Sequence, residues 1–214
     1  MILPEYEANR MLAEAGIPVI PLSVVNSPEE ALNAAARVGF PVVVKLSSSK
    51  YTHKSEIGGV RVNLKTDDDV AAAFGHMDGL RRELDSSALI ILEPMVPAAA
   101  ELFVGFQRHD QFGAVISIGL GGTLLELTSD VAFRLLPARK VDFREMLGEL
   151  KSWAKLKKGF RNFPAADEEG VVNLLERVSD FVLSRPDLLE LDLNPVILQA
   201  DGARAVDARI VLAP

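Results

Sequence analysis

A segment near the C-terminus alternates between apolar and oxygen-bearing side chains. Leucine occupies every second position, and the residues between are Glu190, Asp192 and Asn194. Because successive side chains of a strand point to opposite faces, this alternation predicts a half-buried strand. One face of that strand would pack into a core, and the other would present oxygen atoms for chemistry.

The dipeptide Asp201-Gly202 follows this strand and is a turn signal for a type I′ hairpin. Closing the hairpin there places Asn194 opposite Arg209. Asn194 and Asp207 then lie diagonally on one face, about 7–8 Å apart at the backbone. Both could reach one Mg²⁺ ion, which takes only one or two protein ligands and fills its shell with water and phosphate oxygens. An edge hairpin with a merely solvated polar face is the alternative interpretation.

The composition excludes several classes of protein. With 49% hydrophobic and 25% charged residues, the chain matches an ordinary soluble globular protein, and 214 residues fit one large domain or two lobes. A net charge of −7 argues against a nucleic-acid partner. The longest apolar run, residues 114–125, is short and interrupted by glycines, so no membrane span is expected. The absence of cysteine is typical of a cytoplasmic protein.

The first half of the chain reads as alternating helices and strands. The signals predict a helix over 5–15, a strand over 17–25, a helix between Ser27 and Gly39, strands over 41–45 and 60–64, a helix capped by Thr66 and a strand over 88–92. After the first helix the expected order is therefore β-α-β-β-α-β.

Two prolines, Pro94 and Pro97, stiffen a connector in the middle of the chain. We therefore expect an N-terminal lobe over residues 1–93, a hinge over 94–97 and a C-terminal lobe over 98–214. The second lobe is predicted to contain strands over 101–107 and 113–120, helices over 142–156 and 164–183, and the hairpin. The fold class is α+β (α/β), with ligand chemistry expected between the two lobes.

Lys45 ends the β-branched strand 41–45. Its aliphatic stem can stay in the core while its ammonium group faces whatever lies beyond the strand end, which is how a lysine is aimed at a phosphate. A structural lysine whose head reaches water is the alternative interpretation.

The loop that follows holds His53, Lys54, Gly58 and Gly59. Imidazole is the side chain here that can accept a phosphoryl group near neutral pH, and Lys54 can help to neutralise the anion. The two glycines let backbone amides approach a phosphate. A loop histidine is also commonly plain polar surface. His76, within a helix, is expected to be solvated.

Two carboxylates flank the expected hinge. Glu93 precedes it, and Glu101 interrupts an apolar run just after it, so either could bond a ribose or be solvated. The glycines of residues 119–122 could pass close to a phosphate, but they lack the lysine and the spacing of a phosphate-binding loop, so a tight turn between strands is the favoured interpretation.

In their order along the chain these segments resemble the ATP-grasp domain of ADP-forming acyl-CoA synthetases, the β-subunit-like part. The β subunit of succinyl-CoA synthetase is a more distant relative. The resemblance covers nearly the whole chain. Its most specific parts are His53-Lys54-Ser55-Glu56-Ile57-Gly58-Gly59-Val60 and Glu190-Leu191-Asp192-Leu193-Asn194-Pro195. It implies an ATP-grasp fold, with two α+β lobes and a nucleotide cleft between them.

The resemblance also implies roles for single residues in binding ATP or ADP. Lys45 matches the lysine on the nucleotide phosphates, Glu93 and the backbone through Val96 match the adenine-binding hinge, and Glu101 matches the ribose ligand. Asn194 and Asp207 match the Mg²⁺ ligands.

His53 matches the histidine that receives a phosphoryl group in the ADP-forming acetyl-CoA synthetase branch. In that branch a partner, the CoA-binding α subunit or domain, carries a second phosphohistidine and binds the carboxylic acid and CoA. The resemblance thus implies an ADP-forming acid-CoA ligase that needs this partner for full activity. A nucleotide-sensing lobe of a regulatory protein, such as an acetyltransferase fusion, is a second hypothesis. An ATP-grasp ligase with an amine acceptor is a third.

Overall fold

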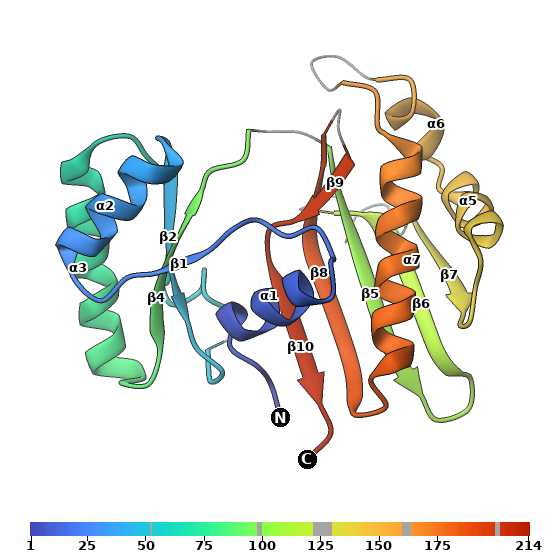
Figure 1. Cartoon of the computed structure of the whole chain (residues 1–214), viewed down its shortest axis with the longest axis horizontal. Helices are drawn as coiled ribbons and strands as arrows, with labels where there is room; N and C mark the ends of the chain where they lie inside the picture. The colour runs from blue at the N-terminus through green and yellow to red at the C-terminus, as the bar shows by residue number, and fades with distance from the viewer. Residues whose placement is uncertain (52, 98–99, 122–129, 160–163, 200–201) are drawn as a thin grey trace. The chain divides into compact units, whose positions relative to one another are not determined.

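The computed structural model describes residues 1–51, 53–97, 100–121, 130–159, 164–199 and 202–214. The fold is α+β, with helices beside two antiparallel sheets (Figure 1). The chain forms two compact units. The N-terminal unit comprises Leu3–Arg10 and Ile20–Pro97, and the C-terminal unit comprises Met1–Ile2, Met11–Val19 and Ala98–Pro214. The break after Pro97 lies at the end of the expected connector, but residues 1–2 and 11–19 group with the C-terminal unit.

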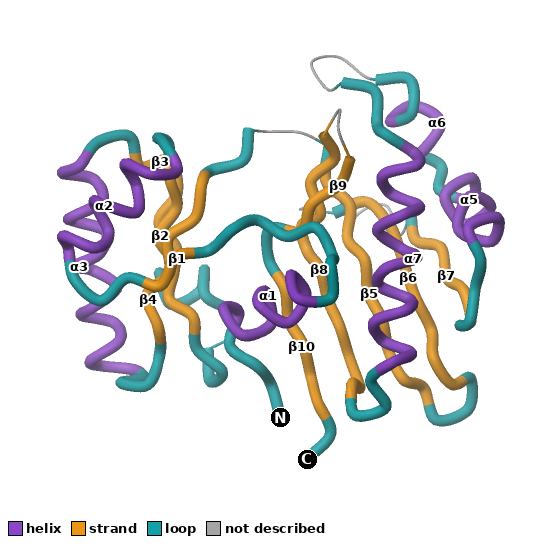
Figure 2. The backbone as a smooth tube through the Cα atoms, in the orientation of Figure 1, coloured by secondary structure: helices purple, strands orange, loops and turns teal. Residues whose placement is uncertain are grey.

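The N-terminal unit is built on a four-stranded sheet in the order β1-β4-β2-β3. Its strands are β1 (Ser23–Val24), β2 (Val42–Ser47), β3 (Val60–Leu64) and β4 (Leu89–Pro94), and its helices are α2 (Pro28–Val38) and α3 (Asp67–Leu84). Helix α1 (Glu5–Glu14) precedes them. The order β-α-β-β-α-β after the first helix agrees with the sequence prediction, and Figure 2 shows α2 and α3 together on one face of this sheet.

Local signals explain both helices of this unit. Ser27 caps α2 by accepting a hydrogen bond from the amide of Glu30, and Thr66 forms a capping box with Asp69 at the start of α3. Val42, Val44 and Leu46 of β2 join the core under these helices. Because side chains alternate along a strand, Val43, Lys45 and Ser47 project from the opposite face.

The C-terminal unit is built on a six-stranded sheet in the order β10-β8-β5-β6-β7, with β9 also paired to β8. The strands are β5 (Glu101–His109), β6 (Gly113–Leu120), β7 (Val131–Leu135), β8 (Leu188–Gln199), β9 (Gly202–Ala205) and β10 (Ala208–Leu212). Helices α5 (Lys140–Glu149), α6 (Trp153–Leu156) and α7 (Glu168–Ser184) complete it, with α5 and α7 against one face of the sheet (Figure 1).

Several boundaries predicted for the C-terminal unit were wrong. The helix predicted over 142–156 is broken into α5 and α6, because the Asp130 carboxylate accepts hydrogen bonds from the amides of Lys151 (2.8 Å) and Ser152 (3.0 Å). The helix predicted over 164–183 begins only at Glu168. Strand β7 was not predicted.

The strand predicted over 17–25 is also wrong in extent. It is reduced to β1 and one isolated parallel bridge between Val19 and Ala205, because Pro18 and Pro21 have no amide hydrogen to donate to a ladder.

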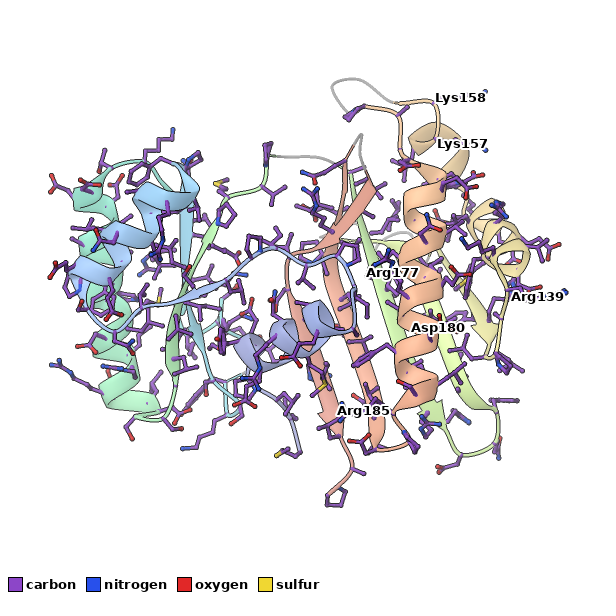
Figure 3. All side chains as sticks on the ribbon, viewed as in Figure 1. Arg139, Lys157, Lys158, Arg177, Asp180 and Arg185 are labelled. Carbon is purple, nitrogen blue, oxygen red and sulfur yellow. The ribbon has the colours of Figure 1, made fainter. Side chains whose placement is uncertain are left out.

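Arginines on and after α7 hold the segment 11–19 within the C-terminal unit. Arg177 donates a hydrogen bond to the carbonyl of Gly16, and Arg185 contacts the sulfur of Met11 at 3.5 Å while pairing with Asp187 at 2.7 Å. Figure 3 labels both arginines. Among the described residues, no helix is long and apolar enough to cross a membrane.

Candidate functional site

Lys45 lies in the middle of the N-terminal sheet, on the face that α2 and α3 leave uncovered. It pairs in register with Ile91 of β4 and Val60 of β3, so its backbone is fixed from both sides. Its ammonium group lies 2.8 Å from Glu93 Oε1 and 2.9 Å from Glu5 Oε1. The predicted phosphate-binding lysine is thus held between two carboxylates, and only 7% of its side chain is exposed.

Glu5 was not singled out in the sequence, yet it joins two lysines. One of its oxygens binds Lys45, and the other lies 2.6 Å from the ammonium group of Lys54. Glu5 is the first residue of α1, where the helix dipole favours a negative charge. The available signal was the acidic first turn of that helix, but it does not reveal which cations the carboxylate meets.

The loop after β2 is held by its own backbone. The amide of Gly59 donates to the carbonyl of Lys54 (2.7 Å), and the Gly59 carbonyl accepts from Leu46 (2.9 Å). Gly58 has φ 70°, a conformation that favours glycine. His76 is exposed, as expected, and its Nε2 lies 3.1 Å from the Gly58 carbonyl.

His53 stands apart from this packed framework. Its side chain is 83% exposed, and its Nδ1 lies 4.0 Å from Glu56 Oε1, at the limit of an ion pair. An exposed imidazole can receive a group from a bound ligand or from another protein. The phosphoryl-accepting role of His53 stays a prediction.

A buried carboxylate fixes the start of the same loop. Asp85 accepts hydrogen bonds at 2.6 Å from the hydroxyls of Ser48 and Ser87, and at 3.2 Å from the ammonium of Lys50. Ser48 in turn accepts from the amides of Lys50 (3.0 Å) and Tyr51 (3.3 Å). Hydrogen bonds from Ser48 and Ser87 hold the pKa of Asp85 well below its ordinary value. Sequence reasoning missed this residue.

Other predicted residues occupy less distinctive positions. Val96 is half-buried just after β4. Glu101 begins β5 opposite Ile197, and its carbonyl accepts from Gly121 at 2.8 Å. A Cβ on Gly121 would lie 2.7 Å from the Leu102 carbonyl, so close strand packing accounts for that glycine. Gly122 lies outside the described residues.

The C-terminal hairpin is real, but its predicted register was wrong by two residues. Leu193 pairs with Ala208 and Asp192 with Arg209. The amide of Asn194 donates to the carbonyl of Asp207 at 3.2 Å, so these two residues oppose each other directly rather than diagonally. Direct opposition brings Cβ atoms to about 4.5–5.5 Å, which favours shared binding of one cation more than the predicted geometry did.

Asp192 lies next to this pair on the same face of β8. Burial raises the pKa of Asp192, the carboxylates of Asp207 and Glu190 raise it further, and Arg209 opposes them. Carboxylates gathered without enough positive charge favour an incoming cation. The alternation along β8 predicted that Asp192 shares the polar face of Asn194, but not that burial and a carboxylate across the hairpin would raise its pKa.

The open face of the C-terminal sheet holds a pocket of about 610 Å³. Its floor includes Gly105 of β5 and Ser117 of β6, which pair in register. Phe103 and Phe133 contribute apolar walls, and Asp192 lies at its polar side. Asn194 and Asp207 do not line this pocket, whereas Asp192 does.

Asn194 and Asp207 fit Mg²⁺ by their chemistry. An amide oxygen and a carboxylate are hard oxygen ligands, and two protein ligands suffice where water and phosphate complete the shell. No group of three or more His, Cys, Asp or Glu residues that could hold a metal occurs in the described part of the chain. The pair thus suits a metal that arrives with a phosphate ligand better than a permanently held structural ion.

Comparison with known proteins gives a consistent result. A family model described as an ATP-grasp domain matches residues 1–212. The β subunit of acetate–CoA ligase [ADP-forming] I from Pyrococcus furiosus is 37% identical over 213 residues, covering 98% of this chain and 91% of that subunit. Acetate–CoA ligase [ADP-forming] II from Archaeoglobus fulgidus is 36% identical over 212 residues, which cover 99% of this chain but 30% of that longer protein.

A solved structure agrees with these relatives. Acetyl-coenzyme A synthetase 1 from Candidatus Korarchaeum cryptofilum, in complex with coenzyme A and Mg-AMPPCP, has a TM-score of 0.84 and 36% identity. The match covers 97% of this chain and 91% of that one, whose phosphohistidine segment points towards the nucleotide-binding site. The chain therefore belongs to the ATP-grasp family, in the group formed by the β subunits and domains of ADP-forming acyl-CoA ligases.

Proposed function

We propose that this chain is the nucleotide-binding subunit or domain of an ADP-forming acyl-CoA ligase. The observation that carries the proposal is the match over nearly its whole length to β subunits of ADP-forming acetate–CoA ligases. The complete reaction would convert ATP, a carboxylic acid and CoA into ADP, phosphate and an acyl-CoA. The absence of cysteine is compatible with work in the cytoplasm.

The residues of the N-terminal unit would bind the nucleotide. Lys45 would neutralise the phosphates, and Gly58 and Gly59, which have no side chain, would let the phosphates approach the backbone of the loop. Glu93 and the backbone at Val96 would bind the adenine. The ion pair between Lys45 and Glu93, at 2.8 Å, supports this assignment, because it holds the lysine side chain in place.

The residues of the C-terminal unit would bind the ribose and the metal. Glu101 would accept from the ribose hydroxyls. Asn194 and Asp207 would hold Mg²⁺, which when bound neutralises charge on the transferring phosphoryl group. Their direct opposition in the hairpin supports this role.

His53 would take the phosphoryl group. The bond between the γ-phosphorus and the bridging oxygen of ATP would break, ADP would leave, and a P–N bond to the imidazole would form. A histidine of a CoA-binding α subunit or domain would then accept the group, and the carboxylic acid and CoA would bind mainly there. The exposure of His53 supports an exchange with another protein.

Phosphorylation mapping tests this proposal. The chain is incubated with Mg-ATP labelled at the γ-phosphate, and we expect acid-labile, alkali-stable label on His53 that disappears in His53→Ala. The chain alone should make no acyl-CoA from acetate, ATP and CoA. A chain that binds ATP but never becomes labelled would instead favour a nucleotide sensor, and acyl-CoA synthesis without a partner would contradict the assignment of CoA binding to that partner.

A further inference from the structure

Three buried charges and one partly buried charge form a cluster in the N-terminal unit. Lys45 from β2 lies between Glu93 of β4 and Glu5 of α1, and Lys54 from the following loop joins Glu5. None of these four side chains is more than 11% exposed. Lys45 and Glu93 have been assigned to the nucleotide and Lys54 was expected to help neutralise an anion, so the position of Glu5 between the two lysines requires its own account.

The Glu5 carboxylate bridges the two lysines as a bound phosphate could. Its Oε1 lies 2.9 Å from Lys45 Nζ, and its Oε2 lies 2.6 Å from Lys54 Nζ. A phosphate group can bridge two ammonium groups in the same way, with neighbouring oxygens and with more negative charge. The two lysines are therefore already spaced to hold one anion between them.

The surroundings of Glu5 also favour a phosphate in the place of its carboxylate. Glu5 begins the ten-residue helix α1, whose N-terminus favours negative charge. The amide of Tyr6 is bound to Ser47 Oγ at 3.1 Å, which ties this helix start to the end of β2 two residues beyond Lys45. Lys54 lies in the same loop, which is closed by the hydrogen bond from the Gly59 amide to the Lys54 carbonyl.

We propose that Glu5 is the resting counterion of a two-lysine phosphate site, and that a nucleotide phosphate takes its place between Lys45 and Lys54. The inference rests on the proposed function and adds to it a second phosphate-binding lysine and a carboxylate that competes with the ligand. Lys45 keeps Glu93 as a partner when Glu5 is displaced. The exchange replaces one anion by another and needs no covalent step.

The alternative is that the cluster is only a structural ion-pair network. The two accounts predict opposite signs for Glu5→Gln. A structural carboxylate, once neutralised, loosens the lysines and weakens anion binding. A competing carboxylate, once neutralised, leaves the lysines to the ligand and strengthens anion binding.

Calorimetric titration of the full chain with inorganic tripolyphosphate tests the sign directly. We expect Glu5→Gln to bind it about fivefold more tightly than the wild type, because one nearby negative charge is gone. We expect Lys54→Met to bind it about tenfold more weakly, because a charge-assisted hydrogen bond is lost. Glu30→Gln is the matched control: it removes the same charge at the start of α2, where Glu30 binds the amide of Asn26, and should change nothing.

Thermal unfolding of each variant shows whether the protein is folded. If Glu5→Gln does not fold, Lys54→Met decides the matter, since Glu5 then still has Lys45 as partner. Unchanged or weaker binding by folded Glu5→Gln, or unchanged binding by Lys54→Met, would overturn the inference.

The proposed function can fail separately. Tighter tripolyphosphate binding by Glu5→Gln in a chain that neither binds Mg-ATP nor labels His53 would support the lysine pair and contradict the ligase assignment. If His53 is labelled but Glu5→Gln binds tripolyphosphate no more tightly than the wild type, the result would support the ligase assignment and contradict the inference about the lysine pair.

Discussion

Two carboxylates, one in each unit, have pKa values displaced in opposite directions. Asp85, in the N-terminal unit, is 3% exposed, and hydrogen bonds from Ser48 and Ser87 lower its pKa. Asp192, in the C-terminal unit, has a raised pKa because of burial and of the neighbouring Asp207. The fold therefore supplies hydrogen-bond donors to Asp85, whereas it places a second carboxylate beside Asp192.

The difference separates a structural role from a binding role. Asp85 is satisfied within the protein, so its charge stabilises the folded chain and holds the start of the loop after β2. Around Asp192, the effect of burial and of the carboxylates of Asp207 and Glu190 outweighs that of Arg209, so the Asp192 charge costs stability in the free protein and favours a cation from outside. Substitutions at the two places should therefore have opposite effects on stability and on activity.

Among the substitutions considered, Asp207→Asn, in the acidic group of Glu190, Asp192 and Asp207, should have the largest effect on activity. We expect phosphorylation of His53 by Mg-ATP to fall about a hundredfold, because the proposed metal ligand loses its charge. The free energy of unfolding should not fall, since the variant removes a negative charge that lies close to the Asp192 carboxylate. The initial rate of label incorporation and a melting curve measure the two effects. Loss of rate together with a lowered melting temperature would place Asp207 on the structural side of the comparison.

Asp85→Asn should have the largest effect on stability. The amide group presents an N–H to a hydroxyl that donates to Asp85, and we expect a loss of about 2–3 kcal/mol in the free energy of unfolding. The folded pKa is lowered, so the contribution of the charge is present above the ordinary pKa of 3.8 and is lost as the pH falls below it. Urea unfolding followed by circular dichroism at pH 7 and at pH 3 measures this. Equal losses at both pH values would contradict an electrostatic origin.

Much of the fold was predictable from local signals. Caps at Ser27 and Thr66 defined two helices, and strand 113–120 was predicted with the bounds that it has. The break between α5 and α6 was not predictable, because it depends on Asp130, which lies far away in sequence from the amides that it binds. Local pattern gave the elements, whereas long-range hydrogen bonds decided where they end.

The candidate site was predictable in part, for the same reason. Alternation along β8 placed Asn194 on a polar face, but the turn signal gave a register wrong by two residues, and only the structure opposes Asn194 to Asp207. Lys45 was singled out as the end of a strand over 41–45, and that boundary was wrong, because hydrogen bonding to β4 carries β2 on to Ser47. Glu5 and Asp85 were missed because their partners come from segments about 40 residues away along the chain.

Asp192→Asn should stabilise the C-terminal unit, in contrast to Asp85→Asn. We expect a gain of about 1 kcal/mol at pH 7.5, because the cost of burying the charge is removed. The folded pKa is raised, so this cost is present above that pKa and disappears as the protein takes up the proton at lower pH. The gain should therefore shrink as the pH is lowered. Fluorescence of Trp153, the one tryptophan and a residue of this unit, follows unfolding in urea. A loss of stability would contradict the comparison.

Glu149→Gln tests whether a lowered pKa alone predicts a stabilising carboxylate. Arg134 hydrogen-bonds to Glu149 at 2.6 Å and 3.0 Å and lowers its pKa, as the donors of Asp85 do. However, the Glu149 side chain is 53% exposed, and water and salt screen an exposed pair, so we expect a loss of no more than about 0.5 kcal/mol. Trp153 fluorescence in urea measures it, and 1 M salt should reduce it further while leaving the Asp85→Asn loss largely unchanged. A loss as large as that of Asp85→Asn would mean that hydrogen bonding to arginine, and not burial, decides how much a carboxylate stabilises this chain.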